Sequence, residues 1–308
     1  MREPTIADRA EYLALRGVVG ALGWLPGHVA DGLGSRIGAL GYRPLAVRRL
    51  VVERQIAAAF PGLDSREVQR IARDAYAHLG RVTIETALLH RRGLHGVLDM
   101  VEQVDGWAVI EAALALGRGV ILVTGHFGNW ELAAAYVAAR GVAIDVVVRG
   151  MNNPLFDGYL TRTRSRLGMA VVHDQVAVRH AMRSLRANRA VGFVIDQGVL
   201  HLASTYVPFF GRPAKTPRGP AVFAMRWGVP VVFGVARREP SGRYRIAIEA
   251  IPAPEWSDRE RAVEELVRGY TGALERWVRR SPEQYFWHHR RWKWQPAETP
   301  PEQRDPSE

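Results

Sequence analysis

A histidine and a glutamate stand four intervening residues apart in the segment His126-Phe-Gly-Asn-Trp-Glu131. An imidazole is a base near neutral pH, and a carboxylate that holds one ring nitrogen leaves the other nitrogen to accept a proton. The spacing would allow general base chemistry, with Glu131 turned back toward His126. A structural histidine, with a first-turn glutamate that compensates the helix dipole, is the alternative for this pair.

The elements around the pair favour a catalytic position. The apolar, β-branched run at 120–124 predicts a buried strand, and the Ala-rich residues from 130 to 140 predict a helix. Asn129 is a good N-cap for that helix and a candidate substrate contact. His126 then lies at the carboxyl end of a strand, where open α/β sheets place their sites.

Two later segments carry further candidates. Arg149 ends a predicted strand at 144–149, and Asn152 lies in the turn that precedes the next helix, at 155–166. Arg164 lies on that helix beside Arg162 and Arg166. An arginine that faces the His–Glu pair would suit a phosphate or a developing oxyanion, whereas a solvated basic face is the alternative.

Asp196 and Gln197 follow a predicted strand at 191–195, so the carboxylate could assist His126 or bind a hydroxyl. A turn aspartate before Gly198 is the alternative. Lys215 and Arg218 lie in residues 207–220, which we interpret as a loop that feeds a helix. Its aromatic and basic residues would suit an anion with an acyl chain.

Composition limits the classes of function. The chain has 308 residues, no cysteine and a net charge of +11 that is nearly all arginine. Disulfides, thiol catalysis and cysteine-ligated zinc are excluded, and the sequence has no zinc-ligand spacing, P-loop or glycine-rich dinucleotide fingerprint. A nucleic acid, an anionic membrane surface or an acidic protein fits the charge.

The ends of the chain predict contacts with large partners. Residues 12–25 and 29–40 are apolar and are followed by arginines, which favours a helix lying in a membrane interface over a buried helix. No apolar run of about 20 residues exists, so a membrane span is not predicted. Residues 283–294 are aromatic and basic, which suits either base stacking or a membrane interface.

The order of elements predicts an α/β fold with a mixed central sheet flanked by helices, because a tight-turn signal at 240–242 joins the last two strands, at 229–236 and 244–251. The remaining expected strand is 170–172, and the remaining expected helices are 107–116, 176–187, 218–226 and 259–279. We expect one integrated domain in three parts: a helical, membrane-associating segment at 1–92, with a long helix from Asp64 or Ser65 to about Leu89; the α/β part at 93–295; and a disordered, Pro- and Glu-rich tail at 296–308.

Taken together, the motifs resemble the bacterial lipid A biosynthesis acyltransferases of the late, lauroyl/myristoyl type. The resemblance covers nearly the whole chain and rests on an ordered set of segments: His126 to Glu131, Arg149 with 152–155, Arg164, Asp196, residues 207–211 with Thr216, and residues 282–287 with 289–291.

The resemblance implies an acyltransferase-like sandwich that moves a fatty acyl group from acyl carrier protein to a hydroxyl of a lipid-linked sugar. It implies no metal or other cofactor, no nucleic acid, and a place on the cytoplasmic face of the inner membrane. His126, Glu131, Arg164 and Asp196 would then be catalytic. Arg149, Asn129, Asn152, Gln197, Lys215 and Arg218 would bind substrate.

Three alternatives stay open from the sequence. Mannoside-lipid acyltransferases share much of the motif set, often with Asp at the position of Glu131, and glycerolipid acyltransferases share the His-x4-acid motif. A basic protein without catalysis, which binds a membrane or nucleic acid, would not require His126 and Glu131 to be paired.

Overall fold

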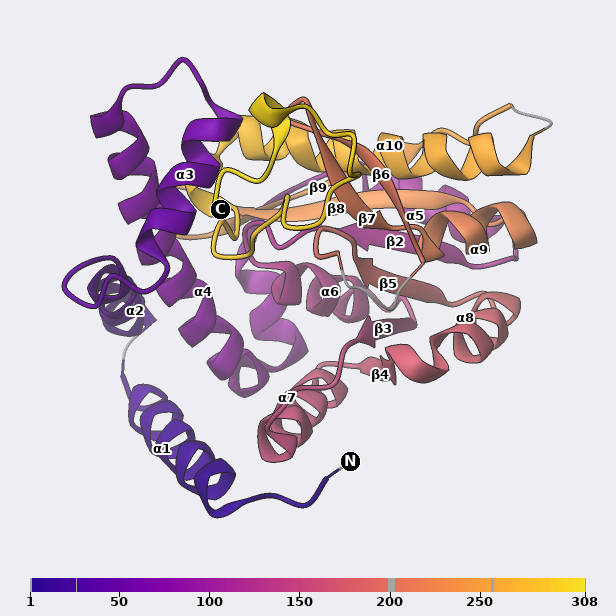
Figure 1. Cartoon of the computed structure of the whole chain (residues 1–308). Helices are drawn as coiled ribbons and strands as arrows, with labels where there is room; N and C mark the ends of the chain where they lie inside the picture. Colours follow the sequence, from indigo (N-terminus) through magenta and orange to yellow (C-terminus); the bar gives the residue numbers. More distant parts are fainter. Residues whose placement is uncertain (1, 26, 199–202, 256–257, 308) are drawn as a thin grey trace.

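The computed structural model describes residues 2–25, 27–198, 203–255 and 258–307 (Figure 1). Its centre is a seven-stranded sheet in the order β1-β9-β8-β2-β5-β3-β4. The strands are β1 (Val101–Asp105), β2 (Val120–Thr124), β3 (Ile144–Val148), β4 (Met169–His173), β5 (Ala190–Val194), β8 (Val231–Arg238) and β9 (Tyr244–Ile251). All neighbours are parallel except β8 and β9. The predicted α/β class with a mixed sheet is confirmed.

Helices cover both faces of the sheet (Figure 1). They are α5 (Trp107–Ala115), α6 (Trp130–Ala139), α7 (Pro154–Arg166), α8 (Ala177–Arg186), α9 (Gly219–Trp227) and α10 (Arg259–Arg280). Successive strand residues point to opposite faces. Phe233 belongs to the same core cluster as Tyr270 and Leu274 of α10, whereas Val232 belongs to the cluster that includes Leu132 of α6. Burial on both faces explains why the strands are continuous apolar runs.

The N-terminal part is helical, as expected, and consists of α1 (Ile6–Leu22), α2 (Gly27–Tyr42), α3 (Arg49–Ala59) and α4 (Ser65–Asp99). Asp64 caps α4 with a capping box that includes Glu67. The helix extends ten residues beyond the expected end at Leu89, although Gly93 interrupts it with φ 63°. Because α4 packs against both α2 and α6, it joins the N-terminal helices to the sheet.

A two-stranded hairpin replaces the loop that we expected at 207–220. Its strands are β6 (Ser204–Phe209) and β7 (Arg212–Pro217), antiparallel and joined at Phe210 and Gly211, both of which have positive φ. Three prolines in these strands make the segment unlike a typical strand sequence. In a two-stranded ribbon both strands are edge strands, so many of their backbone N–H groups do not form ladder hydrogen bonds and proline is tolerated. The hairpin packs on α10.

The C-terminal tail differs from the expected disorder. Residues 296–307 lie beside the hairpin, where the Arg304 carbonyl accepts a hydrogen bond from Arg212 at 2.9 Å. The buried carboxylate of Asp305 pairs with Arg290 at 2.6 Å. These polar contacts hold a segment that has little apolar side chain of its own.

None of the helices in the described part of the chain is long and apolar enough to cross a membrane.

Candidate active site

His126 and Asp196 meet at the carboxyl edge of the sheet. The strands β2 and β5 are parallel neighbours, and Thr124 lies opposite Val194 at their carboxyl ends. His126 and Asp196 each follow two residues later, so they lie side by side. The Nδ1 atom of His126 lies 2.7 Å from Oδ1 of Asp196, and the His126 N–H donates to Oδ2 at 3.1 Å. The carboxylate is therefore held by both the ring and the backbone of His126.

The Asp196 carboxylate remains ionised although it is only 2% exposed. Burial opposes its ionisation, but the nearby His126 and Arg291 charges and the hydrogen bonds from His126 lower the pKa of Asp196 to about 2. An ionised carboxylate can only accept, so Nδ1 is the protonated nitrogen of the neutral ring. The lone pair is then on Nε2, which lies 3.4 Å from the side-chain amide nitrogen of Gln197.

The backbone around His126 is fixed by two other segments. Gly128 adopts φ +56°, and a Cβ there would lie 1.9 Å from the Ala236 carbonyl oxygen, so only glycine fits. The Gly128 N–H donates to the Gln284 carbonyl at 2.9 Å, and the Phe286 N–H donates to the His126 carbonyl at 3.0 Å. The C-terminal segment therefore runs alongside the loop that carries His126.

Aromatic rings flank the imidazole. The Trp130 ring lies 4.8 Å from that of His126 at an interplanar angle of 66°, and the Phe286 ring lies at 5.8 Å. The side chain of His126 is still 20% exposed. One edge of the imidazole thus reaches solvent between the two aromatic rings.

Glu131 does not take the place that we expected beside His126; that prediction is wrong in this structure. Its two oxygens accept hydrogen bonds from Arg164 at 3.0 and 2.6 Å, and both side chains are nearly buried. The first turn of α6 directs Glu131 toward α7, whereas β5 brings Asp196 directly to His126. Glu131 and Arg164 form a bidentate pair, which fixes both side chains.

Asn129 is a structural residue and not the substrate contact that we predicted. It is completely buried, and its side-chain oxygen accepts from the Leu132 N–H at 2.9 Å, which confirms the predicted N-cap of α6. Its amide nitrogen donates to Glu85 of α4 at 3.2 Å. Both ends of the side chain are therefore occupied within the protein.

The other predicted substrate contacts are dispersed. Arg149 and Asn152 are exposed beyond β3, and the Asn152 carbonyl accepts from Arg2 at 3.1 Å. The ammonium group of Lys215 lies 5.9 Å from the Trp294 ring. Arg218 pairs with Glu260 of α10 at 2.6 Å. Of the predicted substrate contacts, Gln197 is the one that contacts the His126 ring.

The segment 283–294 is largely internal, which corrects its interpretation as a surface for bases or lipid. Trp287 and Trp292 are 0% exposed, and Arg291 is 3% exposed. The Arg291 guanidinium donates to the Lys215 carbonyl and to Thr216 Oγ1, each at 2.6 Å. It contributes positive charge near Asp196, a role that sequence reasoning missed because its aromatic neighbours suggested an exposed surface.

Within the described ranges, no group of three or more His, Cys, Asp or Glu side chains could hold a metal ion.

A histidine held by a buried carboxylate at the carboxyl edge of a mixed α/β sheet is an arrangement that can activate a hydroxyl or water for group transfer. Comparison with known proteins specifies the class. Residues 8–294 match the family model described as bacterial lipid A biosynthesis acyltransferase. The chain belongs to this family and is an enzyme that transfers acyl groups.

Individual relatives agree with the family. The chain is 28% identical over 286 residues to the lipid A biosynthesis lauroyltransferase of Escherichia coli (strain K12), which covers 92% of each chain. It is 27% identical to the lipid A biosynthesis palmitoleoyltransferase of the same strain, over 89% of this chain and 88% of the other. A phosphatidylinositol mannoside acyltransferase of Mycobacterium tuberculosis is 28% identical over 50% of this chain and 49% of its own. The family thus comprises enzymes that acylate lipid-linked sugars.

Proposed function

We propose that this enzyme transfers a fatty acyl group from acyl carrier protein to a hydroxyl of a lipid-linked sugar of the lipid A precursor type. The observation that carries the proposed mechanism is the 2.7 Å contact between His126 Nδ1 and Asp196, which leaves Nε2 as the base. The donor is taken from the family resemblance, and the net charge of +11 suits an acidic carrier.

In the proposed reaction, Nε2 of His126 removes the proton from the acceptor hydroxyl as its oxygen attacks the thioester carbonyl. The tetrahedral intermediate collapses, the carbon–sulfur bond breaks, and the imidazolium returns the proton to the leaving thiolate. Asp196 stabilises the imidazolium by charge and holds its ring. A base positioned in this way contributes a factor of about 10²–10⁴ in rate.

The developing oxyanion needs a hydrogen-bond donor. Two backbone donors near His126 are already engaged: the Gly128 N–H donates to the Gln284 carbonyl, and the Asn129 N–H donates to the Ala236 carbonyl. Two nitrogens of the Arg164 guanidinium already donate to Glu131. The Gln197 amide lies beside Nε2, so we assign the oxyanion contact to Gln197 and a positioning role to the Glu131–Arg164 pair.

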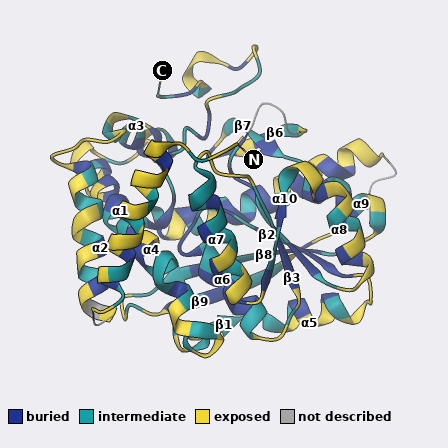
Figure 2. Ribbon diagram, turned by 90° about the horizontal axis from the view of Figure 1, so that it is seen from below, coloured by how far each residue is buried: buried dark blue, intermediate teal, exposed yellow. Residues whose placement is uncertain are grey.

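Attachment to a membrane through α1–α3 is part of the proposal. Among the residues that the structure describes, twelve of the eighteen exposed large hydrophobic side chains lie within the first 50 positions, among them Ile6, Leu13, Trp24, Leu45 and Leu50 at 64–88% exposure. Figure 2 shows exposed positions along the outer sides of α1 and α2. An apolar patch of this kind, on a basic protein, suits the interface of an anionic bilayer, which the resemblance places at the cytoplasmic face of the inner membrane.

A mannoside-lipid acceptor is the second candidate, because half of the chain resembles a phosphatidylinositol mannoside acyltransferase. Incubation of the enzyme with carrier proteins bearing different acyl chains and with both acceptor types, followed by mass spectrometry, tests both. We expect a mass gain of one acyl group on the lipid A precursor. Acylation of the mannoside lipid alone would replace the first candidate with the second.

A further inference from the structure

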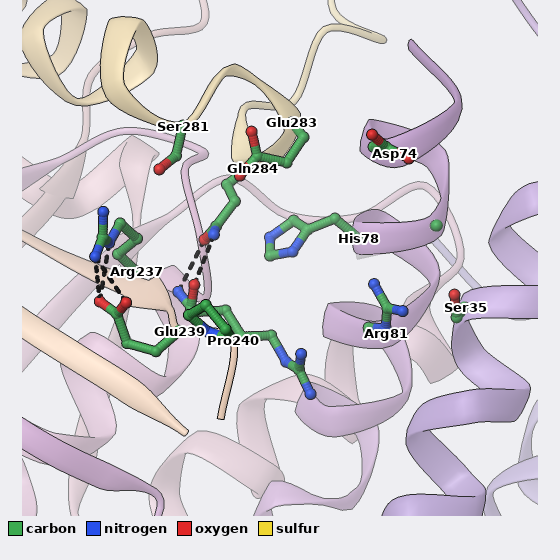
Figure 3. A pocket seen from close by; sticks show the side chains of 12 residues that line it. Ser35, Asp74, His78, Arg81, Arg237, Glu239, Pro240, Ser281, Glu283 and Gln284 are labelled. Carbon is green, nitrogen blue, oxygen red and sulfur yellow. Dashed lines mark hydrogen bonds and ion pairs between the residues drawn. The ribbon is translucent and has the colours of Figure 1, made fainter. Parts of the chain in front are cut away.

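A cavity of about 530 Å³ lies beside the catalytic loop, between α2, α4, the end of β8 and the residues that follow α10 (Figure 3). Cavities of this size are typical of sites for small molecules. None of the ten residues predicted as site residues lines it. The cavity is therefore a separate feature of the fold that the catalytic pair does not explain.

The cavity and the catalytic loop share a wall. The ring of His78 projects from α4 toward Gln284, and its Nε2 lies 3.4 Å from the Gly128 carbonyl oxygen, two residues from His126 (Figure 3). Gln284 also lines the cavity, and its carbonyl accepts the Gly128 N–H at 2.9 Å. A ligand in the cavity would thus lie against the segments that position His126.

The cationic groups on one side of the cavity are already neutralised. Arg237 donates to both oxygens of Glu239 at 2.6 and 2.7 Å. Arg238 pairs with Asp31 of α2 at 2.7 Å, and its backbone exchanges two hydrogen bonds with the side chain of Gln284. Figure 3 shows the Arg237–Glu239 pair on this side of the cavity. With both guanidinium groups paired, this wall offers little positive charge to an anion.

The less engaged groups offer both donors and acceptors. The Arg81 guanidinium has one ion-pair contact among the described residues, at 3.5 Å to Asp31, and the Asp74 carboxylate has a contact at 3.7 Å to the exposed Arg70. Ser35 and Ser281 add hydroxyl groups to the lining. Glu283 also lines the cavity, and burial raises the pKa of its carboxyl group. One guanidinium, two carboxyl groups and two hydroxyls therefore offer donors and acceptors without an excess of positive charge.

His78 adds a neutral polar group. Burial lowers its pKa to about 4, so the ring is uncharged near neutral pH. Since the Gly128 carbonyl can only accept, Nε2 carries the proton and Nδ1 is left as an acceptor. A phosphate, which needs donors and positive charge, would instead meet acceptor groups at His78 and Asp74.

We propose that this cavity binds the saccharide of the lipid-linked acceptor. Sugar hydroxyls both donate and accept, which matches a lining that mixes donors and acceptors. The wall that the cavity shares with the catalytic loop, at Gly128, is two residues from His126 along the chain. The apolar faces of α1 and α2 would place the lipid chains of the same molecule in the membrane. This inference rests on the proposed function, since it assigns a place to that acceptor.

Direct binding tests the proposal without any reaction. Saturation-transfer NMR is recorded on the full-length protein with N,N′-diacetylchitobiose, with the fully deacylated saccharide of a lipid A precursor, and with inorganic phosphate as a competitor. We expect both saccharides to bind, and Asp74→Asn and Arg81→Gln each to weaken binding about tenfold. Arg70→Gln is the matched control, because it removes the surface partner of Asp74 and leaves the lining unchanged. Binding that persists in both lining variants, no saccharide binding, or displacement by phosphate would overturn the proposal.

Kinetics then separate this inference from the proposed function. In Asp74→Asn and Arg81→Gln we expect KM for the acceptor to rise about tenfold, with KM for the acyl carrier protein unchanged. A KM change confined to the donor would overturn the assignment. If the wild-type protein bound the saccharide through these residues but acylated no acceptor, the cavity would stand and the proposed function would fall.

Discussion

Asp196 binds His126 at two points, the ring Nδ1 at 2.7 Å and the backbone N–H at 3.1 Å. The first contact selects the tautomer, and the second ties the carboxylate to the same loop. Because the two residues end adjacent parallel strands, the geometry is set by the most buried part of the sheet. The pair is held in place before any substrate binds.

Substitution of either member should abolish most of the transfer. We expect His126→Ala and Asp196→Asn each to lower kcat by a factor of about 10²–10⁴. His126→Ala removes the proposed base. In Asp196→Asn the amide can donate to Nδ1, which would favour the wrong tautomer of the ring. Turnover is measured with labelled acyl carrier protein. His95→Ala is the control, since that side chain is 91% exposed at the end of α4. Near-normal turnover in either site variant would contradict the proposed mechanism.

The Glu131–Arg164 pair should contribute to stability and to activity, and a double variant can separate the two effects. Arg164→Gln leaves a nearly buried carboxylate without its partner, which costs about 3–5 kcal/mol of unfolding free energy. The double variant Glu131→Gln/Arg164→Gln should recover most of that stability in urea titrations but not the turnover. A double variant with wild-type activity would show that the pair has no part in catalysis.

Asn129 should couple the start of α6 to the active site. Asn129→Ala removes the cap and the donor to Glu85, so we expect a loss of about 1–2 kcal/mol together with a marked drop in activity. Asp258→Ala removes the corresponding cap of α10 and should cost about as much stability. Equal activity losses in the two variants would indicate a general effect of destabilisation.

Apolar side chains of the N-terminal part should carry membrane attachment. Leu13 and Leu45 are both 68% exposed, and burial of a leucine contributes about 1.5–3 kcal/mol. We therefore expect Leu13→Ser/Leu45→Ser to weaken sedimentation with phosphatidylglycerol-containing vesicles more than tenfold. Leu116→Ser, at a 55% exposed position after α5, should have no effect. Unchanged sedimentation of the double variant would argue against this attachment.

Stability should fall as the solution is acidified below about pH 6.5. Burial lowers the pKa of His78, His288 and His289 to about 4, so the unfolded chain binds more protons than the folded one between pH 6.5 and 4. The contribution of these neutral rings is complete above pH 6.5 and is lost toward pH 4. Asp196 affects stability at lower pH. Its lowered pKa contributes about 2 kcal/mol to the free energy of unfolding above pH 4, and this contribution is lost as the pH falls toward 2. Urea titrations from pH 7 to pH 4 measure the upper part of this dependence.

His288→Phe provides a sharp test of the upper window. Neither ring nitrogen of His288 has a hydrogen-bond partner among the described residues, and the ring stacks on Phe286 at 5.2 Å. Phenylalanine removes the unsatisfied nitrogens, so we expect a gain of about 1 kcal/mol and a shallower pH dependence. A variant that is less stable than the wild type at pH 7 would contradict this account.

Local patterns in the sequence determined the elements that carry the site. The apolar run of β2, the Asn129 cap and the Ala-rich α6 depend on neighbouring residues, so the position of His126 at a strand end could be predicted. The tight turn between β8 and β9 likewise predicted the mixed sheet. The ordered motifs were sufficient for the family.

Only the tertiary structure decided which carboxylate holds His126. Asp196 lies 70 residues away, and its contact depends on β5 pairing with β2, which no local pattern specifies. Glu131 is close in sequence, but the turn of its helix directs it to Arg164. The C-terminal segment was misjudged for the same reason, because composition cannot tell whether Trp287 and Trp292 face water or a core. Strand order and burial arise from the packing of distant segments, and these decided the chemistry of the site.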